Sequence, residues 1–255
     1  MSNSTETPPL CVADDATFWP WHRWPEFARW HNPAETIVIL PLVGLADWGL
    51  GHPLEAEEIV LMSVLRAASQ QRPEGLPILV VPPVRFVLGP DPGSAFAVEP
   101  PVAHALVAEI AASIVASGFR RVVLLNASPW NEEFIAAAAR DLRIALGLQM
   151  FRISLSGLGL DFHPVRSRTR HELQTLITAL TGRAPEAAPA GEAAPRVWGD
   201  EAVRPLTEPA LSVEAAQAAG PAILEAAAKK LVGLLREVHA RPPLANGGVI
   251  AKAQP

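Results

Sequence analysis

Four short apolar segments recur along the chain and alternate with stretches of helical periodicity. The apolar segments span residues 36–43, 76–82, 120–126 and 149–155, and runs of this length rich in aliphatic and β-branched residues are typical of buried strands. Helical patterns cover residues 55–72, 102–117, 131–146 and 212–240, and Gly118 and Gly147 follow two of them as stop signals. The pattern therefore predicts a β-α-β-α-β-α-β order with a final long helix.

This order predicts the α/β fold class. Strands that alternate with helices form a mainly parallel sheet with helices on both faces, which gives three α/β/α layers. In such sheets ligands bind beyond the carboxyl ends of the strands. We therefore expect a functional site at the loops 44–54 and 127–130, which follow the first and third predicted strands.

The predicted helix 102–117 is apolar almost all round. Glu109 is its only charged residue, and His104 and Ser113 are its other main polar side chains. Such a helix needs cover on both sides. One side can be the sheet, whereas the other can be a neighbouring subunit or a second helix of the same chain. Because 49% of all residues are hydrophobic and only 18% are charged, we favour the subunit and expect a homo-oligomer.

Composition and charge exclude several classes of partner. The net charge is −5 and no basic run is present, so we expect no nucleic acid. The longest apolar run, 37–46, is too short to cross a bilayer, and the first residues do not resemble a signal peptide, so we expect no membrane and a cytoplasmic protein. The single cysteine, Cys11, excludes an internal disulfide, and we assign it no role.

We expect one domain. It should span residues 21–240, with an Ala/Pro-rich loop at 183–196, a flexible N-terminal segment at 1–20 and a disordered tail at 241–255. Four tryptophans lie near the start of this domain, at Trp19, Trp21, Trp24 and Trp30. Aromatic residues in such a segment are expected to pack on the core or on a partner subunit.

Two motifs and several shorter segments resemble the creatininase family. Residues 40–49, LPLVGLADWG, with Pro53, Leu54 and Glu57 after them, are similar to its first signature, P-V-G-S-x-E-Q-H-G-x-H-x-P-x-x-x-D. Residues 118–131, GFRRVVLLNASPWN, are similar to its G-F-R-R-I-V-x-V-N-G-H-G-G-N block. Weaker likenesses occur at 92–94, 197–200 and 220–224, so the resemblance runs from about residue 24 to 238. It implies a creatininase-like α/β/α fold.

The family's metal ligands are largely replaced. The resemblance implies an amidohydrolase with two divalent ions, which activate water and polarise the scissile carbonyl. Position by position, the Glu and His of the first signature fall on Ala46 and Trp48, and its Asp falls on Glu57. The His of the second block falls on Ser128, and the further acidic ligand of creatininase falls on Trp130. Only Glu57 can still bind a hard cation, so we expect no metal and no catalytic residue.

These five positions have two interpretations. In the family's fold, the positions of Trp48 and Trp130 face one another across a cleft, so the indoles can fill a vacated metal cavity and restore packing. The alternative interpretation is a pocket for a planar or cationic small-molecule ligand. A remnant of a third signature, H-A-G-E-x-E-T-S, matches either residues 169–176, through Glu172 and Thr175, or residues 190–192.

A rebuilt site is the alternative. A register shift of one residue could bring His52 inward beside Glu57, and acidic residues are close by. Its candidate residues are Asp47, His52, Glu57 and Asn126, with Glu55 and Glu58 as further carboxylates. Against this, three glutamates at the start of a helix are typical of a solvated face that complements the helix dipole. Ser128 as a nucleophile lacks a Gly-x-Ser-x-Gly elbow and a neighbouring His.

Two functions follow. The leading hypothesis is a catalytically silent creatininase-like protein without cofactor, which acts as a structural or regulatory subunit or as a small-molecule binding module. It would form a homo-oligomer, with the hexamer that the resemblance implies, or a hetero-oligomer with an active paralogue. The alternative is a hydrolase of a cyclic amide or another non-peptide C–N bond, with a rebuilt site that uses a divalent metal such as zinc or manganese.

Overall fold

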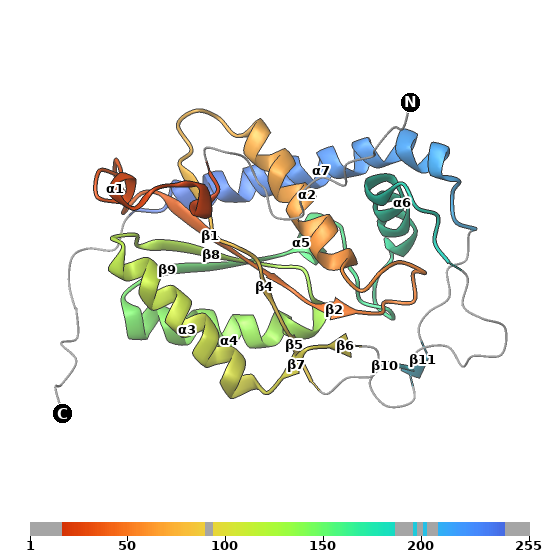
Figure 1. Cartoon of the computed structure of the whole chain (residues 1–255), viewed down its shortest axis with the longest axis horizontal. Coiled ribbons are helices and arrows are strands. Elements are labelled where there is room, and N and C mark those ends of the chain that lie inside the picture. The colour runs from red at the N-terminus through yellow and green to blue at the C-terminus, as the bar shows by residue number, and fades with distance from the viewer. Residues whose placement is uncertain (1–16, 90–93, 187–195, 198–200, 203–208, 243–255) are drawn as a thin grey trace.

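A parallel sheet forms the centre of the molecule (Figure 1). The computed structural model describes residues 17–89, 94–186, 196–197, 201–202 and 209–242. Four strands, β1 (Ile37–Val43), β3 (Ile78–Val80), β8 (Arg121–Asn126) and β9 (Gln149–Ser154), lie in the order β3-β1-β8-β9, with every pairing parallel. A fifth strand, β4 (Val84–Arg85), also pairs with β1. The four predicted strands and their parallel arrangement are confirmed.

Pro41 occupies a central strand without breaking it. A proline has no backbone N–H, so it is normally excluded from the middle of a sheet. The carbonyl of Ile39 accepts a hydrogen bond from Val81 on the β3 side, whereas the carbonyl of Leu42 accepts one from Ala127 on the β8 side. Successive residues of a strand direct their backbone N–H and C=O groups to opposite sides. Pro41 therefore directs its nitrogen to the same side as Ile39, where it faces the break between β3 and β4. No sheet hydrogen bond is lost there.

Helices cover both faces of the sheet (Figure 1). The helices α3 (Pro100–Ala116) and α4 (Glu132–Leu146) lie on one face, and α2 (Ala56–Gln71), α6 (Arg170–Thr181) and α7 (Val213–His239) lie on the other. Alternate residues of β1 enter the two cores: Ile37 and Ile39 pack with α2 and α7, whereas Val38 and Leu40 pack with α3 and α4. The three-layer α/β/α architecture is therefore as predicted.

Short elements complete the described part of the chain. They are η1 (Trp19–Trp21), α1 (Trp24–Phe27), β2 (Leu45–Ala46), β5 (Val87–Leu88), β6 (Ser94–Ala95), β7 (Ala97–Val98), η2 (Pro129–Asn131), α5 (Leu155–Leu158), β10 (Arg196–Val197) and β11 (Glu201–Ala202). Strand β2 pairs with β6, β5 with β7 and β10 with β11. Cys11, most of the predicted N-terminal segment, residues 92–93, most of the Ala/Pro-rich loop and nearly all of the predicted tail lie outside the described residues.

Two local features distinguish the helical layer formed by α3 and α4. Asn131 precedes α4 but does not cap it with its side chain, because its amide instead donates to the carbonyl of Phe86 and accepts from the N–H of Leu88. This ties the start of α4 to β5. The outer side of α3 is uncovered within the described chain, where Val102 and Leu106 are exposed, and the second helix beside it, α4, packs along its flank. None of the described helices is long and apolar enough to span a bilayer.

Candidate functional site

The site lies where β1 and β8 end side by side. Residue Leu42 of β1 pairs with Asn126 of β8, so the loops that follow the two strands start together. After β8 the chain turns sharply, because the Asn126 side chain accepts from the N–H of Ser128 at 3.2 Å and donates to the carbonyl of Ser128 at 2.7 Å. Pro129 then begins η2, which fixes the place of Trp130.

Glu57 lies at the bottom of this site. It belongs to the first turn of α2 and is fully buried. One carboxylate oxygen accepts from the N–H of Gly44 at 2.5 Å, and the other accepts from the indole N–H of Trp48 at 3.0 Å. Burial raises the pKa of Glu57 from 4.5 to about 7, and the donors at Gly44, Trp48 and Ser128 only partly oppose this. The pKa of this carboxyl therefore lies near neutral pH instead of well below it.

The Ser128 hydroxyl contacts the same carboxylate weakly. It is fully buried, and it lowers the pKa of Glu57 less than the other two donors do. Its oxygen makes no hydrogen bond of standard geometry within the described chain. A protonated Glu57 could donate to this oxygen, because a carboxylic acid carries one O–H that the carboxylate lacks.

The two tryptophans pack against each other. Their ring centroids are 5.4 Å apart with an interplanar angle of 43°, and Trp48 also contacts the buried ring of Phe162 at 6.0 Å. Trp48 is 4% exposed, whereas Trp130 is partly buried. Ala46 belongs to the same buried cluster. The structure thus brings Trp48, Glu57, Ser128 and Trp130 together, and the interior that they form is packed with indole.

Helix α6 holds the loop that carries Trp48. Arg170 donates to the carbonyl of Trp48 at 2.8 Å, Gln174 donates to that of Leu50 at 2.9 Å, and Thr178 lies 3.3 Å from the ring nitrogen of His52. These three side chains are four residues apart, so they lie on one face of α6. Sequence reasoning missed this helix and this contact, although the spacing of polar residues at 170, 174 and 178 was a readable signal.

The residues of the alternative site do not converge, because Asn126 binds the backbone of Ser128 near Glu57, whereas Asp47 and His52 have other partners. Asp47 is exposed and accepts from the N–H of Gly49, while His52 lies against α6, where burial lowers its pKa. Glu58 is nearly fully buried and forms a two-pronged ion pair with Arg85, at 2.6 and 2.7 Å. Glu57 and Glu58 are therefore not the solvated face that a helix start normally presents, because each has an internal partner.

The residues present do not fit a dinuclear metal centre. Within the described ranges, no group of three or more His, Cys, Asp or Glu side chains could hold a metal ion. Both oxygens of Glu57 already accept hydrogen bonds. An indole has no lone pair available for coordination, so Trp48 and Trp130 cannot replace imidazole or carboxylate.

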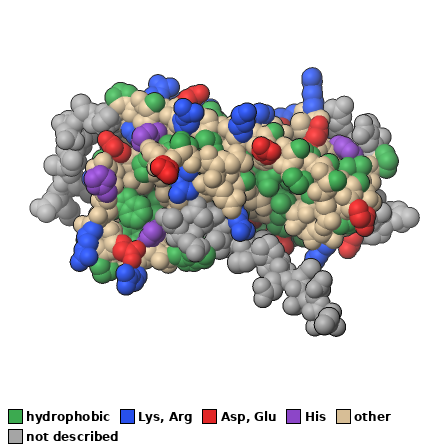
Figure 2. Space-filling model, turned by 90° about the horizontal axis from the view of Figure 1, so that it is seen from above, with side chains coloured by type: hydrophobic (Ala, Val, Ile, Leu, Met, Phe, Trp, Pro, Cys, Tyr) green, Lys and Arg blue, Asp and Glu red, His purple; other side chains and the backbone are tan. Residues whose placement is uncertain are grey.

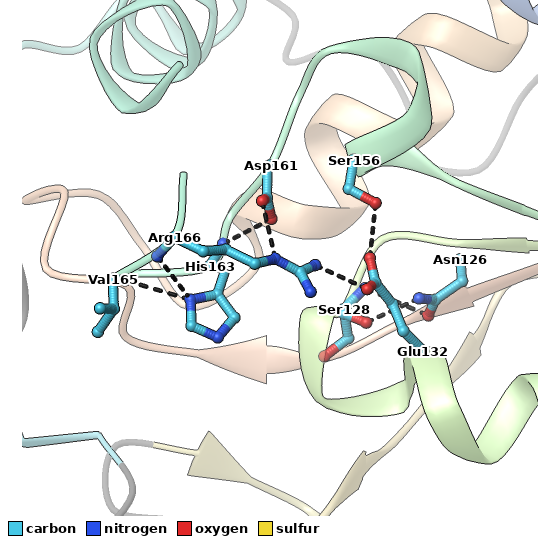
Figure 3. A network of polar contacts seen from close by, with 8 residues as sticks. All are labelled: Asn126, Ser128, Glu132, Ser156, Asp161, His163, Val165 and Arg166. Carbon is cyan, nitrogen blue, oxygen red and sulfur yellow. Dashed lines mark hydrogen bonds and ion pairs between the residues drawn. The ribbon is translucent and has the colours of Figure 1, made fainter. Parts of the chain in front are cut away.

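A polar network borders the site at the ends of β8 and β9 (Figure 3). Arg166 bridges Glu132 at 2.7 Å and Asp161 at 3.0 Å, and Ser156 donates to the other oxygen of Glu132 at 2.6 Å. The Nδ1 atom of His163 accepts from two backbone N–H groups, which holds its ring at 5.2 Å from that of Trp130. These residues come from three separate segments, so no local pattern in the sequence connects them.

Comparisons with known proteins agree with this fold. A model of the creatininase family, described as creatinine amidohydrolase, matches residues 22–235. No curated protein matches the chain in sequence.

Solved structures share the fold. A creatinine amidohydrolase (creatininase) has a TM-score of 0.64 at 16% identity, with 90% of this chain and 100% of that chain covered. A protein described as a creatinine amidohydrolase, from Bacteroides fragilis NCTC 9343, has a TM-score of 0.63 at 13% identity, with coverages of 90% and 98%. A structure named creatininase Mn has a TM-score of 0.61 at 19% identity, with coverages of 89% and 100%. This chain belongs to the creatininase family.

Proposed function

We propose that this chain is a non-catalytic member of the creatininase family that acts as a structural or regulatory subunit. The observation that carries the proposal is the contact between Trp48 and Glu57. The single remaining acidic residue at the family's ligand positions is enclosed and hydrogen-bonded by an indole that stands where the family has an imidazole. The side chains at these positions fill the interior, whereas the family's chemistry would require them to bind two cations.

The packing of Trp48 favours this role over a stacking pocket. A ring that binds a planar or cationic ligand must offer one face to it. Trp48 is 4% exposed, its ring packs against Trp130 and Phe162, and its indole N–H donates to Glu57. Neither its ring nor its N–H is therefore available to a ligand. Only Trp130 remains partly accessible. If a small molecule bound at this place, its quenching of tryptophan fluorescence would have to vanish in Trp130→Ala.

The metal content of the protein tests the proposal directly. Protein purified without chelator should contain far less than one zinc, manganese or iron per chain, and it should hydrolyse neither creatinine nor a panel of formamides. Stoichiometric metal that is lost together with hydrolysis in Glu57→Ala, but kept in Glu55→Ala, would overturn the proposal. Glu55 is a suitable control because it immediately precedes the same helix and is only partly buried.

The alternative hydrolase would need a rebuilt site around His52 and Glu57. The pKa of about 7 is the observation in its favour, since a group that titrates near neutral pH can serve as a general base. Against it, His52 lies on Thr178 of α6, whereas Glu57 is bound to Gly44 and Trp48 inside the core. Hydrolysis in the same panel that is lost in both His52→Ala and Glu57→Ala would favour the hydrolase.

We further propose that this cytoplasmic subunit assembles through α3, as a homo-oligomer such as a hexamer or with an active paralogue. Val102 is 58% and Leu106 is 43% exposed on the outer side of this helix, where Glu109 is the only charge. Light scattering should show an oligomer that Leu106→Lys weakens and that Lys229→Glu, on α7 beyond the opposite face of the sheet, leaves intact. A monomeric parent protein would refute this assembly.

A further inference from the structure

A groove lies on the helical face opposite α3, between α5, α6 and α7. Its volume is about 340 Å³, near the lower end of the range for small-molecule sites in proteins. Leu158, Leu160 and Ile223 supply apolar walls. Seen from this side of the molecule, charges of both signs are interspersed with apolar side chains rather than gathered in one patch (Figure 2). The groove is separate from the tryptophan pair.

Small residues create the hollow. Helix α7 presents Ala222 and Ala226, four residues apart and thus on one face, so at these two positions only methyl groups enter the groove. Gly159 follows α5 with φ +95°, a backbone conformation that favours glycine. A Cβ atom at this position would lie 3.0 Å from the Nζ atom of Lys230. Glycine therefore leaves room for the ammonium group at the edge of the groove.

Two opposite charges border this apolar hollow. Lys230 donates one N–H to the carbonyl of Leu158 at 3.1 Å, which leaves two of its three donors for another acceptor. Glu172, in the first turn of α6, is exposed, and its carboxylate forms no hydrogen bond or ion pair with any described residue. A cation and an anion with remaining binding capacity thus line the same cavity.

We propose that this groove binds a free α-amino acid with an aliphatic side chain. The carboxylate of the ligand is held by Lys230, its ammonium by Glu172, and its side chain rests on Ile223 and the small residues of α7. Charge-assisted hydrogen bonds at both ends recognise the zwitterion, and the apolar walls select the side chain. The site is independent of the proposed lack of catalysis, because it shares no residue with the tryptophan pair.

Titration with L-leucine tests the proposal. In ligand-observed NMR and calorimetry, L-leucine should bind to the full-length protein with a millimolar or tighter Kd. Glycine should bind more weakly because it lacks the side chain. Leucinamide, which lacks the carboxylate, and 4-methylpentanoate, which lacks the ammonium, should each lose about tenfold or more in affinity.

Matched variants locate the binding. Lys230→Gln and Glu172→Gln should each weaken leucine binding about tenfold or more, and Ala226→Leu should abolish it by filling the groove. Lys229→Gln and Glu225→Gln change the same residue types at exposed positions of α7 outside the groove and should have no effect. Absence of binding in the parent protein, or equal affinities in the groove and control variants, would overturn the proposal.

Discussion

Replacement of Glu57 by glutamine should remove a specific pH dependence of stability. In the folded protein, burial raises the pKa of this carboxyl to about 7, whereas in the unfolded chain it returns to 4.5. Between these two values the unfolded chain gives up the proton and the folded protein keeps it. Because the folded state then binds more protons, its stability decreases as the pH rises from 4.5 to about 7.

The size of this effect follows from the two pKa values. Their difference corresponds to about 3 kcal/mol of unfolding free energy, all of which is lost above pH 7 and none of which is lost well below pH 4.5. His52 acts in the opposite direction, since burial lowers its pKa and its contribution is lost as the pH falls. Its effect is common to the parent protein and the variant, so it cancels in the difference between them.

Urea unfolding monitored by tryptophan fluorescence measures this difference. From pH 5 to pH 8, the stability of Glu57→Gln relative to the parent should change by about 2–3 kcal/mol in favour of the variant. The amide also places an N–H₂ group where the carboxylate accepts from Gly44 or Trp48, which adds a cost independent of pH. Glu55→Gln should show no such change. If the difference between Glu57→Gln and the parent is the same at both pH values, the reasoning is refuted.

Two further pairs of variants test the packing, with the same urea assay. Trp48→Ala should lower the unfolding free energy by about 3–5 kcal/mol, because it leaves a cavity at a buried position. Trp24 is 75% exposed, so Trp24→Ala should change the unfolding free energy by less than about 0.5 kcal/mol. Similar losses in the two variants would contradict the space-filling role of Trp48. Gly220→Ala should cost about 1–3 kcal/mol, because its Cβ would lie 2.4 Å from that of Ala179 on α6. Gly233→Ala, with open space around it on the same helix, should instead stabilise the protein by about 0.5–1 kcal/mol, and a gain in both variants would contradict the close crossing of α6 and α7.

Local sequence determined the layers of this protein. The strands β1, β8 and β9 begin and end within a residue of their predicted bounds. For β1 and β8 the reason is that a strand buried on both faces is a short, largely apolar run, whereas β9, at the edge of the sheet, carries Gln149, Arg152 and Ser154 at partly or fully exposed positions. The two motifs also singled out Trp48, Glu57, Ser128 and Trp130 as candidate site residues. In the structure Trp48 contacts Glu57 and Trp130, and Ser128 lies beside Glu57. Helix α6 was missed because its buried face includes Gln174, Thr175 and Thr178, which weakens the apolar periodicity.

Only the tertiary structure decided how these residues are used. Glu57 and Glu58 are adjacent at the start of one helix, where the sequence predicts solvated carboxylates, yet one binds an indole and the other an arginine. The partner Arg85 is 27 residues away, and Arg170 reaches the carbonyl of Trp48 across 122 residues. The pKa of a carboxyl and the exposure of an indole depend on such distant neighbours. Local periodicity carries no information about them, because it reports which face of an element is apolar and not which element will cover it.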